Sequence, residues 1–369
     1  MTDEQDRVTL TVDGMDYAGW KGVEISAGIE RQARDFTLGV TWRWPGSESR
    51  PLRIRHGARC QVRIGADLVL TGYVDATPIE YGKTSITTSI TGRSLTEDLI
   101  DCSVSQTPGQ WRGQTVLQIV RGLAQPYGIS VIDEGGDGAT VADHTVEPGE
   151  TVFESIDRLL SLSELLSTDD EHGRLVLVQP GSKGRASDAL ELGKNILTGR
   201  APLDFSEVFS DYQCVGQRAG TDNEFGEAAS EVTASVADDR ATRYRLKVVQ
   251  PSGQLSALLA QRRAQWERDS SLGRALAVEY EVQGWRQSSG ELWRPNLIVR
   301  VRDELMGFDR DMLISEVTYR LDDQGTVARL GLAPPEAFLP EPGKGRKKAK
   351  KGKGGDAFEY LLPEDWESQ

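Results

Sequence analysis

The chain has 369 residues, and at roughly 150 residues per domain this length predicts two or three domains with sizeable cores, which excludes a disulfide-stapled miniprotein. Hydrophobic residues make up 38% and charged residues 27%, so the composition is that of a globular protein and not of a disordered chain. Acidic residues outnumber basic ones 57 to 43, and a net charge of −14 makes nucleic acid and anionic lipid poor partners.

The N-terminus and the cysteines indicate where the protein folds. Residues 1–6 are acidic, whereas a signal peptide is basic and then apolar, and no run reaches the roughly 18 apolar residues that a membrane span needs. Cys60, Cys102 and Cys214 are odd in number and lack a CxxC spacing, so they predict buried thiols and neither disulfides nor zinc. We therefore expect folding in a cytoplasm and no membrane anchor.

The first 95 residues carry the period-two pattern of β-strands. Apolar residues alternate with polar ones in several short runs separated by Gly and Pro, which is typical of an antiparallel sandwich or small barrel. The runs are Val8 to Val12, Phe36 to Trp42, Val62 to Ile64, Leu68 to Leu70 and Ile86 to Ile90. We assign residues 1–95 to a first β-barrel domain.

A small α/β module follows at residues 96–180. Thr115 with Gln118, and Thr151 with Glu154, have the spacing of helix capping boxes, and each begins a stretch with apolar residues on one helical face. An acidic turn at residues 169–173 then leads into an apolar strand at 175–178. The sequence predicts two short helices and at least one strand here.

The β pattern returns at about residue 190, and we assign residues 181–340 to a second β-barrel domain. The expected strands are Arg243–Val249, Leu276–Val282, Leu297–Arg302, Met312–Leu321 and Val327–Leu332, with a hairpin turn at Asp322–Gly325 between the last two. An amphipathic helix is expected at about 252–268. It would be capped by Ser252 and would place Leu255, Leu258, Leu259, Arg262 and Trp266 along one side.

Residues 341–369 differ in composition from the rest of the chain. A block of like charges interspersed with glycine cannot bury apolar area, so it predicts a solvated linker, with an electrostatic docking element as the alternative. The basic residues of the block are Lys344, Arg346, Lys347, Lys348, Lys350, Lys351 and Lys353. An acidic stretch with several apolar residues follows it.

Reagents for catalysis or metal binding are few. His56, His144 and His172 lie in unrelated segments, and no HExxH, G-x-S-x-G or P-loop pattern occurs. The stretch Asp133–Gly138 matches a calcium loop only in part, and we expect an acidic turn. Asp169 and Asp170 could serve a glycosidase, but adjacent turn carboxylates are normally solvated. We expect no catalytic residue, cofactor or metal.

Four tryptophans are candidate partner contacts, because Trp is enriched at interface hot spots. They are Trp42 and Trp44 at a strand end, and Trp285 and Trp293 on either side of a Ser-Ser-Gly turn. The alternative, which we favour, is that they fill the ends of the barrels.

An ordered series of phrases in the second half makes the sequence recognisable. They are Glu191–Leu197, Tyr212–Gln217, Arg262–Glu267, Gly284–Trp285, Gly290–Asn296, Met312–Val317 and Leu330–Phe338. In this order they resemble the baseplate hub protein of Mu-like phages, the tail protein P (gpP) family, whose relatives include the hub portion of the type VI secretion spike protein VgrG. The resemblance covers about residues 5–340. In addition, the Pro148–Thr151 helix module looks like a LysM domain, a fold that can bind glycan.

The resemblance implies an α+β, mainly β chain with two tube-like antiparallel β-barrels and a LysM-like module. It also implies a non-enzymatic homotrimer in the virion, assembled in the host cytoplasm, that joins a six-fold tail tube to a three-fold central spike as a symmetry adaptor. Tail tube protein, spike and other baseplate proteins would be its partners, and genomic DNA would pass through its channel without specific binding. The alternative is a cell-wall glycan binder or peptidoglycan-degrading tail protein.

With that resemblance, the C-terminal stretch becomes a candidate partner contact. We expect it to dock on the spike or a neighbouring baseplate protein, held by the flexible basic linker. Its apolar residues are Phe358, Tyr360, Leu361, Leu362 and Trp366.

Overall fold

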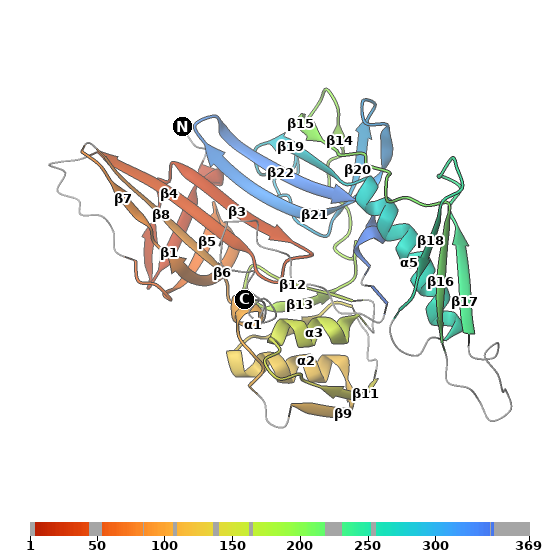
Figure 1. Ribbon diagram of the computed structural model, residues 1–369. Coiled ribbons are helices and arrows are strands. Elements are labelled where there is room, and N and C mark those ends of the chain that lie inside the picture. Colours follow the sequence, from red (N-terminus) through yellow and green to blue (C-terminus); the bar gives the residue numbers. More distant parts are fainter. Residues whose placement is uncertain are drawn as a thin grey trace, which may run out of the picture.

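A large, mainly antiparallel β-sheet is the main part of the fold, with a small α/β module and a helix-bearing unit attached to it (Figure 1). The mainly β, α+β class expected from the sequence is confirmed. The computed structural model describes residues 4–43, 54–83, 85–105, 109–135, 140–161, 165–217, 231–251, 256–339 and 341–342. Trp44, Ser252, Leu255 and the C-terminal stretch from Gly343 onwards lie outside the described residues.

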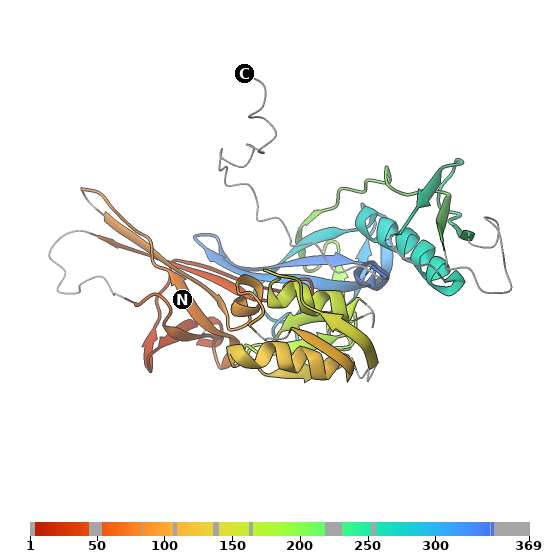
Figure 2. The ribbon, with the colours of Figure 1, turned by 60° about the horizontal axis from the view of Figure 1, so that its bottom comes forward.

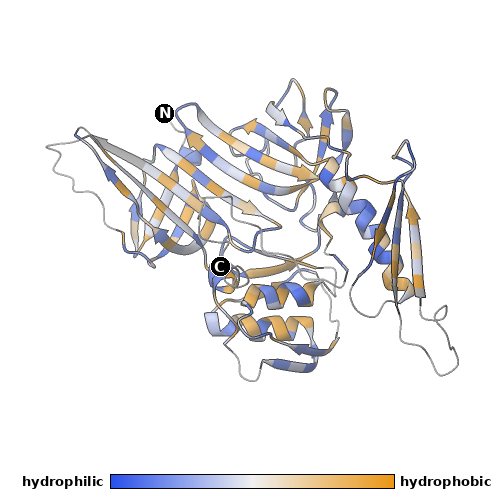
Figure 3. Ribbon diagram, in the orientation of Figure 1, coloured by the Kyte–Doolittle hydropathy of each residue, from blue (hydrophilic) through white to orange (hydrophobic). Residues whose placement is uncertain are grey.

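The N-terminal strands appear where the alternating runs predict them. Hydrophobic and polar residues alternate along several of these arrows in Figure 3, and in β1 the first, third and fifth residues are buried. After a short 3-10 turn at Glu4–Asp6, the strands are β1 (Val8–Val12), β2 (Met15–Tyr17), β3 (Gly22–Gly28), β4 (Asp35–Arg43), β5 (Arg59–Ile64), β6 (Asp67–Ala76), β7 (Ile79–Tyr81) and β8 (Ser85–Ser94).

The C-terminal strands include one long hairpin. Its turn joins the pair Asp322 and Gly325, as predicted from the turn residues, and Gly325 has a φ of 115°, which glycine tolerates best. The elements are β14 (Leu190–Glu191), β15 (Ile196–Arg200), β19 (Val278–Gln283), β20 (Ile298–Asp303), β21 (Phe308–Asp322), β22 (Gly325–Ala333) and the 3-10 helix η3 (Pro335–Phe338).

The two sets of strands are one sheet and not two closed barrels. β21 pairs with β3 from Glu316 opposite Gly28 to Leu321 opposite Val23, and the strand order runs β15-β19-β22-β21-β3-β4-β8-β6-β5-β1-β2. No closed barrel occurs among the strands described, so that part of the sequence prediction is wrong for the single chain. The reason is the length of β21, whose 15 residues pair with β20 before a bulge near Ser315 and with β3 after it.

The α/β module lies below the large sheet in Figure 1 and has its own apolar core. Both predicted capping boxes are present: Thr115 caps one helix with Gln118, and Thr151 caps the other with Glu154. The elements are α1 (Glu97–Asp101), β9 (Gln110–Thr115), α2 (Val116–Ala124), η2 (Gln125–Tyr127), β10 (Val131–Asp133), β11 (Thr140–Thr145), α3 (Val152–Leu160), β12 (Leu166–Asp169) and β13 (Leu175–Val178).

The helix-bearing unit consists of one long helix packed on a three-stranded sheet of order β17-β16-β18. Its members are β16 (Asp211–Gln217), β17 (Glu231–Ala237), β18 (Leu246–Val249) and α5 (Ala257–Ala275). The helix therefore begins and ends later than expected. Ser256 caps it by accepting a hydrogen bond from the Leu259 backbone at 3.2 Å, and the expected cap Ser252 is not described.

The buried face of α5 also differs from the expected one. Leu258 is 65% exposed and Arg262 is exposed, whereas Ala260 and Ala264 are completely or almost completely buried. These alanines pack on Cys214, Val232 and Val236 of the small sheet. Small residues let the helix approach the strands closely, so the contact falls on them and not on the leucine stripe. Trp266 and Leu259 are half-buried, in agreement with the expectation.

The whole arrangement is elongated, with the β7–β8 strands at one end and the α5 unit at the other (Figure 2). None of the helices described is both long and apolar enough to cross a bilayer.

Candidate assembly surfaces

Two of the four candidate tryptophans lie in the interior and not on a partner surface. Trp285 is completely buried and Trp293 is 2% exposed. The Trp285 indole donates hydrogen bonds to the carbonyl oxygens of Arg320 (3.1 Å) and Val327 (3.0 Å), at the end of the long hairpin. The prediction that Trp285 and Trp293 are exposed partner contacts is therefore wrong. Their burial agrees with the alternative, in which these side chains fill the interior.

The structure does not describe the side chains of the other candidate partner contacts. Trp42 is in β4, where its backbone pairs with Ile86, but its side chain lies outside the description. Trp44, the basic linker and all five apolar residues of the C-terminal stretch are outside the described residues as well.

The histidines and cysteines are dispersed. His56 and His172 are exposed, whereas His144 is buried and lies 2.8 Å from the Ser155 hydroxyl. Burial, helped by the nearby Arg158 charge, lowers the pKa of His144 to about 4. Cys60 and Cys214 are buried and Cys102 is half-buried. Within the described ranges, no three His, Cys, Asp or Glu side chains come together as a metal site would require.

The carboxylates of the acidic turn hold the module to the sheet. Asp169 is buried, and its carboxylate accepts hydrogen bonds from the Arg34 backbone at 3.0 Å and the Arg34 guanidinium at 3.3 Å. Burial raises the pKa of Asp169 to about 6 although Arg34 opposes this shift. Asp170 accepts from the Arg174 guanidinium at 2.6 Å. Each acid thus has an internal arginine partner, which does not favour a glycosidase pair.

The polar groups of the Pro148–Thr151 phrase are used within the module. The Thr151 hydroxyl accepts from the Glu154 backbone at 3.2 Å, and the Glu150 carboxylate accepts from the Glu147 backbone and from Arg158, both at 2.9 Å. The phrase therefore fixes the start of α3, which accounts for it without a glycan. Asp133, at the start of the partial calcium match, accepts from the Gly135 backbone at 3.0 Å, Glu134 pairs with Lys183, and residues 136–138 of that stretch are not described.

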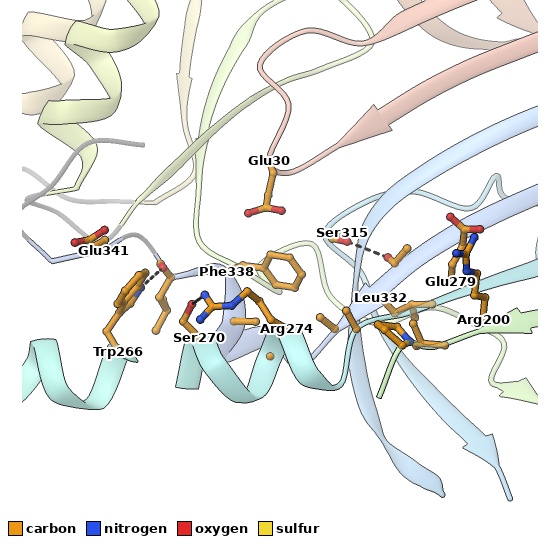
Figure 4. A pocket seen from close by; sticks show the side chains of 18 of the residues that line it. Glu30, Arg200, Trp266, Ser270, Arg274, Glu279, Ser315, Leu332, Phe338 and Glu341 are labelled. Carbon is orange, nitrogen blue, oxygen red and sulfur yellow. Dashed lines mark hydrogen bonds between the residues drawn. The ribbon is translucent and has the colours of Figure 1, made fainter. Parts of the chain in front are cut away.

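A groove of about 1020 Å³ separates α5 from the ends of β22 and β15 (Figure 4). Trp266, Leu332 and Phe338 contribute apolar walls, and Arg274 of α5 points along it. The last described residues lie at this groove: the Trp266 indole donates to the Leu339 carbonyl oxygen at 2.7 Å, and Glu341 is among the lining residues.

A line of ion pairs connects Glu341, at the edge of this groove, to the small sheet. Glu341 pairs with Arg263, whose guanidinium also donates to Glu267 at 2.6 Å, and Glu267 lies 3.0 Å from Lys247 of β18. Burial of Glu267 alone would raise its pKa, but the hydrogen bonds from Lys247 and Arg263 outweigh this effect and lower the pKa. The last described residues are therefore linked to β18 through the side chains of α5.

β18 is an edge strand with apolar side chains in solvent. It pairs with β16 alone among the strands described, and Tyr244, Leu246 and Val248 are 78%, 42% and 55% exposed. Leu246 and Val248 share one side of the strand, opposite Lys247, which pairs with Glu267 of α5. Together with Tyr244, which lies two residues before the strand, we call them the β18 stripe. An unpaired apolar edge usually has a covering partner, because it would otherwise promote aggregation.

The two ends of the large sheet are also open. β15 pairs only with β19 and β2 only with β1, among the strands described. Each carries an exposed apolar residue, Leu197 on β15 and Met15 on β2, which are 51% and 58% exposed.

Comparison with known proteins identifies the family. Family models match three parts of the chain: the N-terminal domain of the Mu phage baseplate assembly protein GpP at residues 7–94, the second domain of baseplate hub protein gp44-like proteins at 96–179, and the fourth domain of GpP at 256–341. Baseplate hub protein gp44 of Escherichia phage Mu is 34% identical over 364 residues, which cover 96% of this chain and 95% of that protein. The chain belongs to the Mu phage baseplate hub family.

Solved structures agree with this assignment. The 43 kDa tail protein of prophage MuSo2 from Shewanella oneidensis has 33% identity and a TM-score of 0.83, and the match covers 90% of the hub chain and 99% of that protein. A component of the type VI secretion system from E. coli shares the fold at 12% identity and a TM-score of 0.54, over 92% of the hub chain and 79% of that protein. The resemblance drawn from the sequence phrases is confirmed, and the hub chain is a structural protein of a phage baseplate.

The sequence analysis did not predict the open edges of the sheets or the β18 stripe. A strand was expected at Arg243–Val249, and its alternating apolar residues were visible. Sequence periodicity cannot show, however, which strand of a sheet lacks a neighbour.

Proposed function

We propose that the hub chain works as a non-enzymatic homotrimer that joins a six-fold tail tube to a three-fold central spike. The observation that carries the proposal is the β3–β21 pairing, which joins two β-rich halves of one chain into a single sheet. Three chains would supply six such halves, so one side can present six similar positions to the tube while the assembly keeps three-fold symmetry.

The contacts between chains would form at the open ends of the large sheet. A heterologous contact, in which one surface of a chain binds a different surface of the next, closes into a ring when the rotation allows it. β15 and β2 are opposite ends of the strand order, and both carry exposed apolar residues. Pairing of such edges would also remove their unpaired backbone groups from solvent.

The trimer would sit in the virion baseplate after assembly in the host cytoplasm. Its partners would be the tail tube protein, the spike and other baseplate proteins. A net charge of −14 suits a channel through which genomic DNA passes without binding, because an acidic wall repels phosphate. Trp42 and Trp44 remain predicted partner contacts of this assembly.

Light scattering coupled to size exclusion tests the trimer. A mass of about 122 kDa, three times the chain mass of 40.5 kDa, is expected for the closed assembly. Leu197→Lys and Met15→Lys should reduce this mass, whereas the control Leu305→Lys, at a site 85% exposed in the turn between β20 and β21, should not. If the protein is a monomer both alone and with the purified cognate spike protein, the proposal is wrong.

A further inference from the structure

The β18 stripe has no cover in the described part of the chain, although it is an apolar edge in a strongly acidic protein. We propose that the C-terminal segment 357–363 of the same chain adds to the free edge of β18 as an extra strand. This proposal is independent of the trimer. Docking of the same residues on the spike or a neighbouring baseplate protein, which was expected from the sequence, is the alternative outcome of the test below.

The position of the last described residues is the first argument. Glu341 is one of the last described residues, and it is linked to Lys247 of β18 through only two side chains, Arg263 and Glu267. From Gly343 to Gly355 the chain then has 13 residues rich in Lys and Gly. A flexible linker of that length spans on the order of 20 Å on average, which gives the segment the reach to return to the unit that contains α5 and β18.

The side-chain pattern is the second argument. In the segment, Phe358, Tyr360 and Leu362 recur at every second position, the same spacing as Tyr244, Leu246 and Val248 in and beside β18. Neighbouring strands of a sheet place such residues on a common face. The added strand would therefore extend the stripe into a continuous apolar surface in which each side chain shields its neighbour.

Charge complementarity is the third argument. The strand and the residues just before it carry Arg243, Arg245 and Lys247, a basic group in an acidic protein. The guanidinium of Arg245 lies 4.7 Å from the centre of the Phe209 ring, and Lys247 faces α5 through Glu267. In the segment, Glu359 lies outside the alternating apolar set, so its carboxylate would be on the same face as the basic group.

Main-chain hydrogen bonds would supply the rest of the recognition, as in other cases of strand addition to an open edge. Because the segment is tethered, its effective concentration at β18 is on the order of millimolar, so even weak pairing would be well populated.

Hydrogen exchange of the full-length protein tests the proposal. We compare the backbone amides of residues 244–249 in the native chain, in Tyr360→Pro and in the control Gly352→Pro. Proline at 360 removes the middle aromatic residue of the alternating set and disfavours the extended backbone that the added strand needs, whereas proline at 352 changes only the linker. Exchange at β18 should be about tenfold faster or more in Tyr360→Pro and unchanged in Gly352→Pro, because an uncovered edge strand exchanges from an open state.

A photo-crosslinking amino acid at position 361 tests which copy supplies the segment. The experiment uses a mixture of isotopically labelled and unlabelled protein. Position 361 of a labelled chain should crosslink to β18 of a labelled chain, and position 361 of an unlabelled chain to β18 of an unlabelled chain. Equal exchange in all three proteins would overturn the proposal. So would crosslinks that join differently labelled copies, or β18 protection that appears only after spike or another baseplate protein is added, since the segment would then serve a partner.

Discussion

Arg34 and Asp169 are 135 residues apart in the sequence, and together they fasten the α/β module to the large sheet. The Arg34 guanidinium donates to the Asp169 carboxylate, to the Asp169 carbonyl oxygen at 3.2 Å and to the Val69 carbonyl oxygen at 2.9 Å. One side chain thus connects the β3–β4 turn, β6 and β12. Such a connection should keep the module from moving independently of the sheet.

Arg34→Ala should lower the free energy of unfolding by about 3–5 kcal/mol, because it leaves a buried carboxylate without its partner. The control is Arg31→Ala, which removes ion pairs to Asp35 and Glu316 whose side chains are about 40% exposed, and which should cost about 1 kcal/mol or less. Urea denaturation followed by tryptophan fluorescence measures both. Equal losses in the two variants would show that the buried pair has no special role.

Gly72→Ala should be destabilising by about 3 kcal/mol, at the upper end of overpacking effects. A Cβ atom at Gly72 would lie 1.8 Å from the Arg93 carbonyl oxygen of the adjacent strand, and a backbone atom in a sheet cannot move away cheaply. Gly39→Ala is the matched control in the same sheet, since its Cβ would meet nothing closer than 3.9 Å. Thermal unfolding of both variants decides the matter, and a stable Gly72→Ala protein would contradict this packing.

His144 should make the protein sensitive to mild acid. Its folded pKa of about 4 is below the ordinary value of 6.5, so between these values the unfolded chain binds the additional proton. The stability that neutral His144 contributes is thus complete above about pH 6.5 and is lost as the pH falls towards 4, by up to about 3 kcal/mol. His144→Gln should flatten this part of the stability profile relative to the native protein. Parallel profiles between pH 6.5 and 4 would refute the assignment.

Trp285→Ala should cost about 3–5 kcal/mol, as expected for removal of a large buried side chain. Trp285→Phe should cost less, about 1–3 kcal/mol, because the ring is kept while the carbonyl groups of Arg320 and Val327 lose their donor. The control Tyr81→Ala, at a site 85% exposed, should change stability by about 0.5 kcal/mol or less. Chemical denaturation measures the free energy of unfolding of all three variants. An unchanged value for Trp285→Ala would contradict the burial of this side chain and would favour a surface role.

The sequence determined the local elements and the family. The capping residues Thr115 and Thr151, the turn at Asp322–Gly325 and the alternating strands depend on neighbours within a few residues, and all are present as predicted. The order of several sequence phrases in the second half pointed to a baseplate hub, which the 34% identity to Mu gp44 confirmed.

Only the tertiary structure decided how those elements are combined. The pairing of β21 with β3, the burial of Trp285, the alanine face of α5 and the open edge of β18 all depend on contacts between residues far apart in the chain. Periodicity shows that a residue has an apolar side, but it does not identify the surface that covers that side. Which strands become neighbours is set by the competition of all strands for the same core, and this competition is resolved only when the whole chain packs.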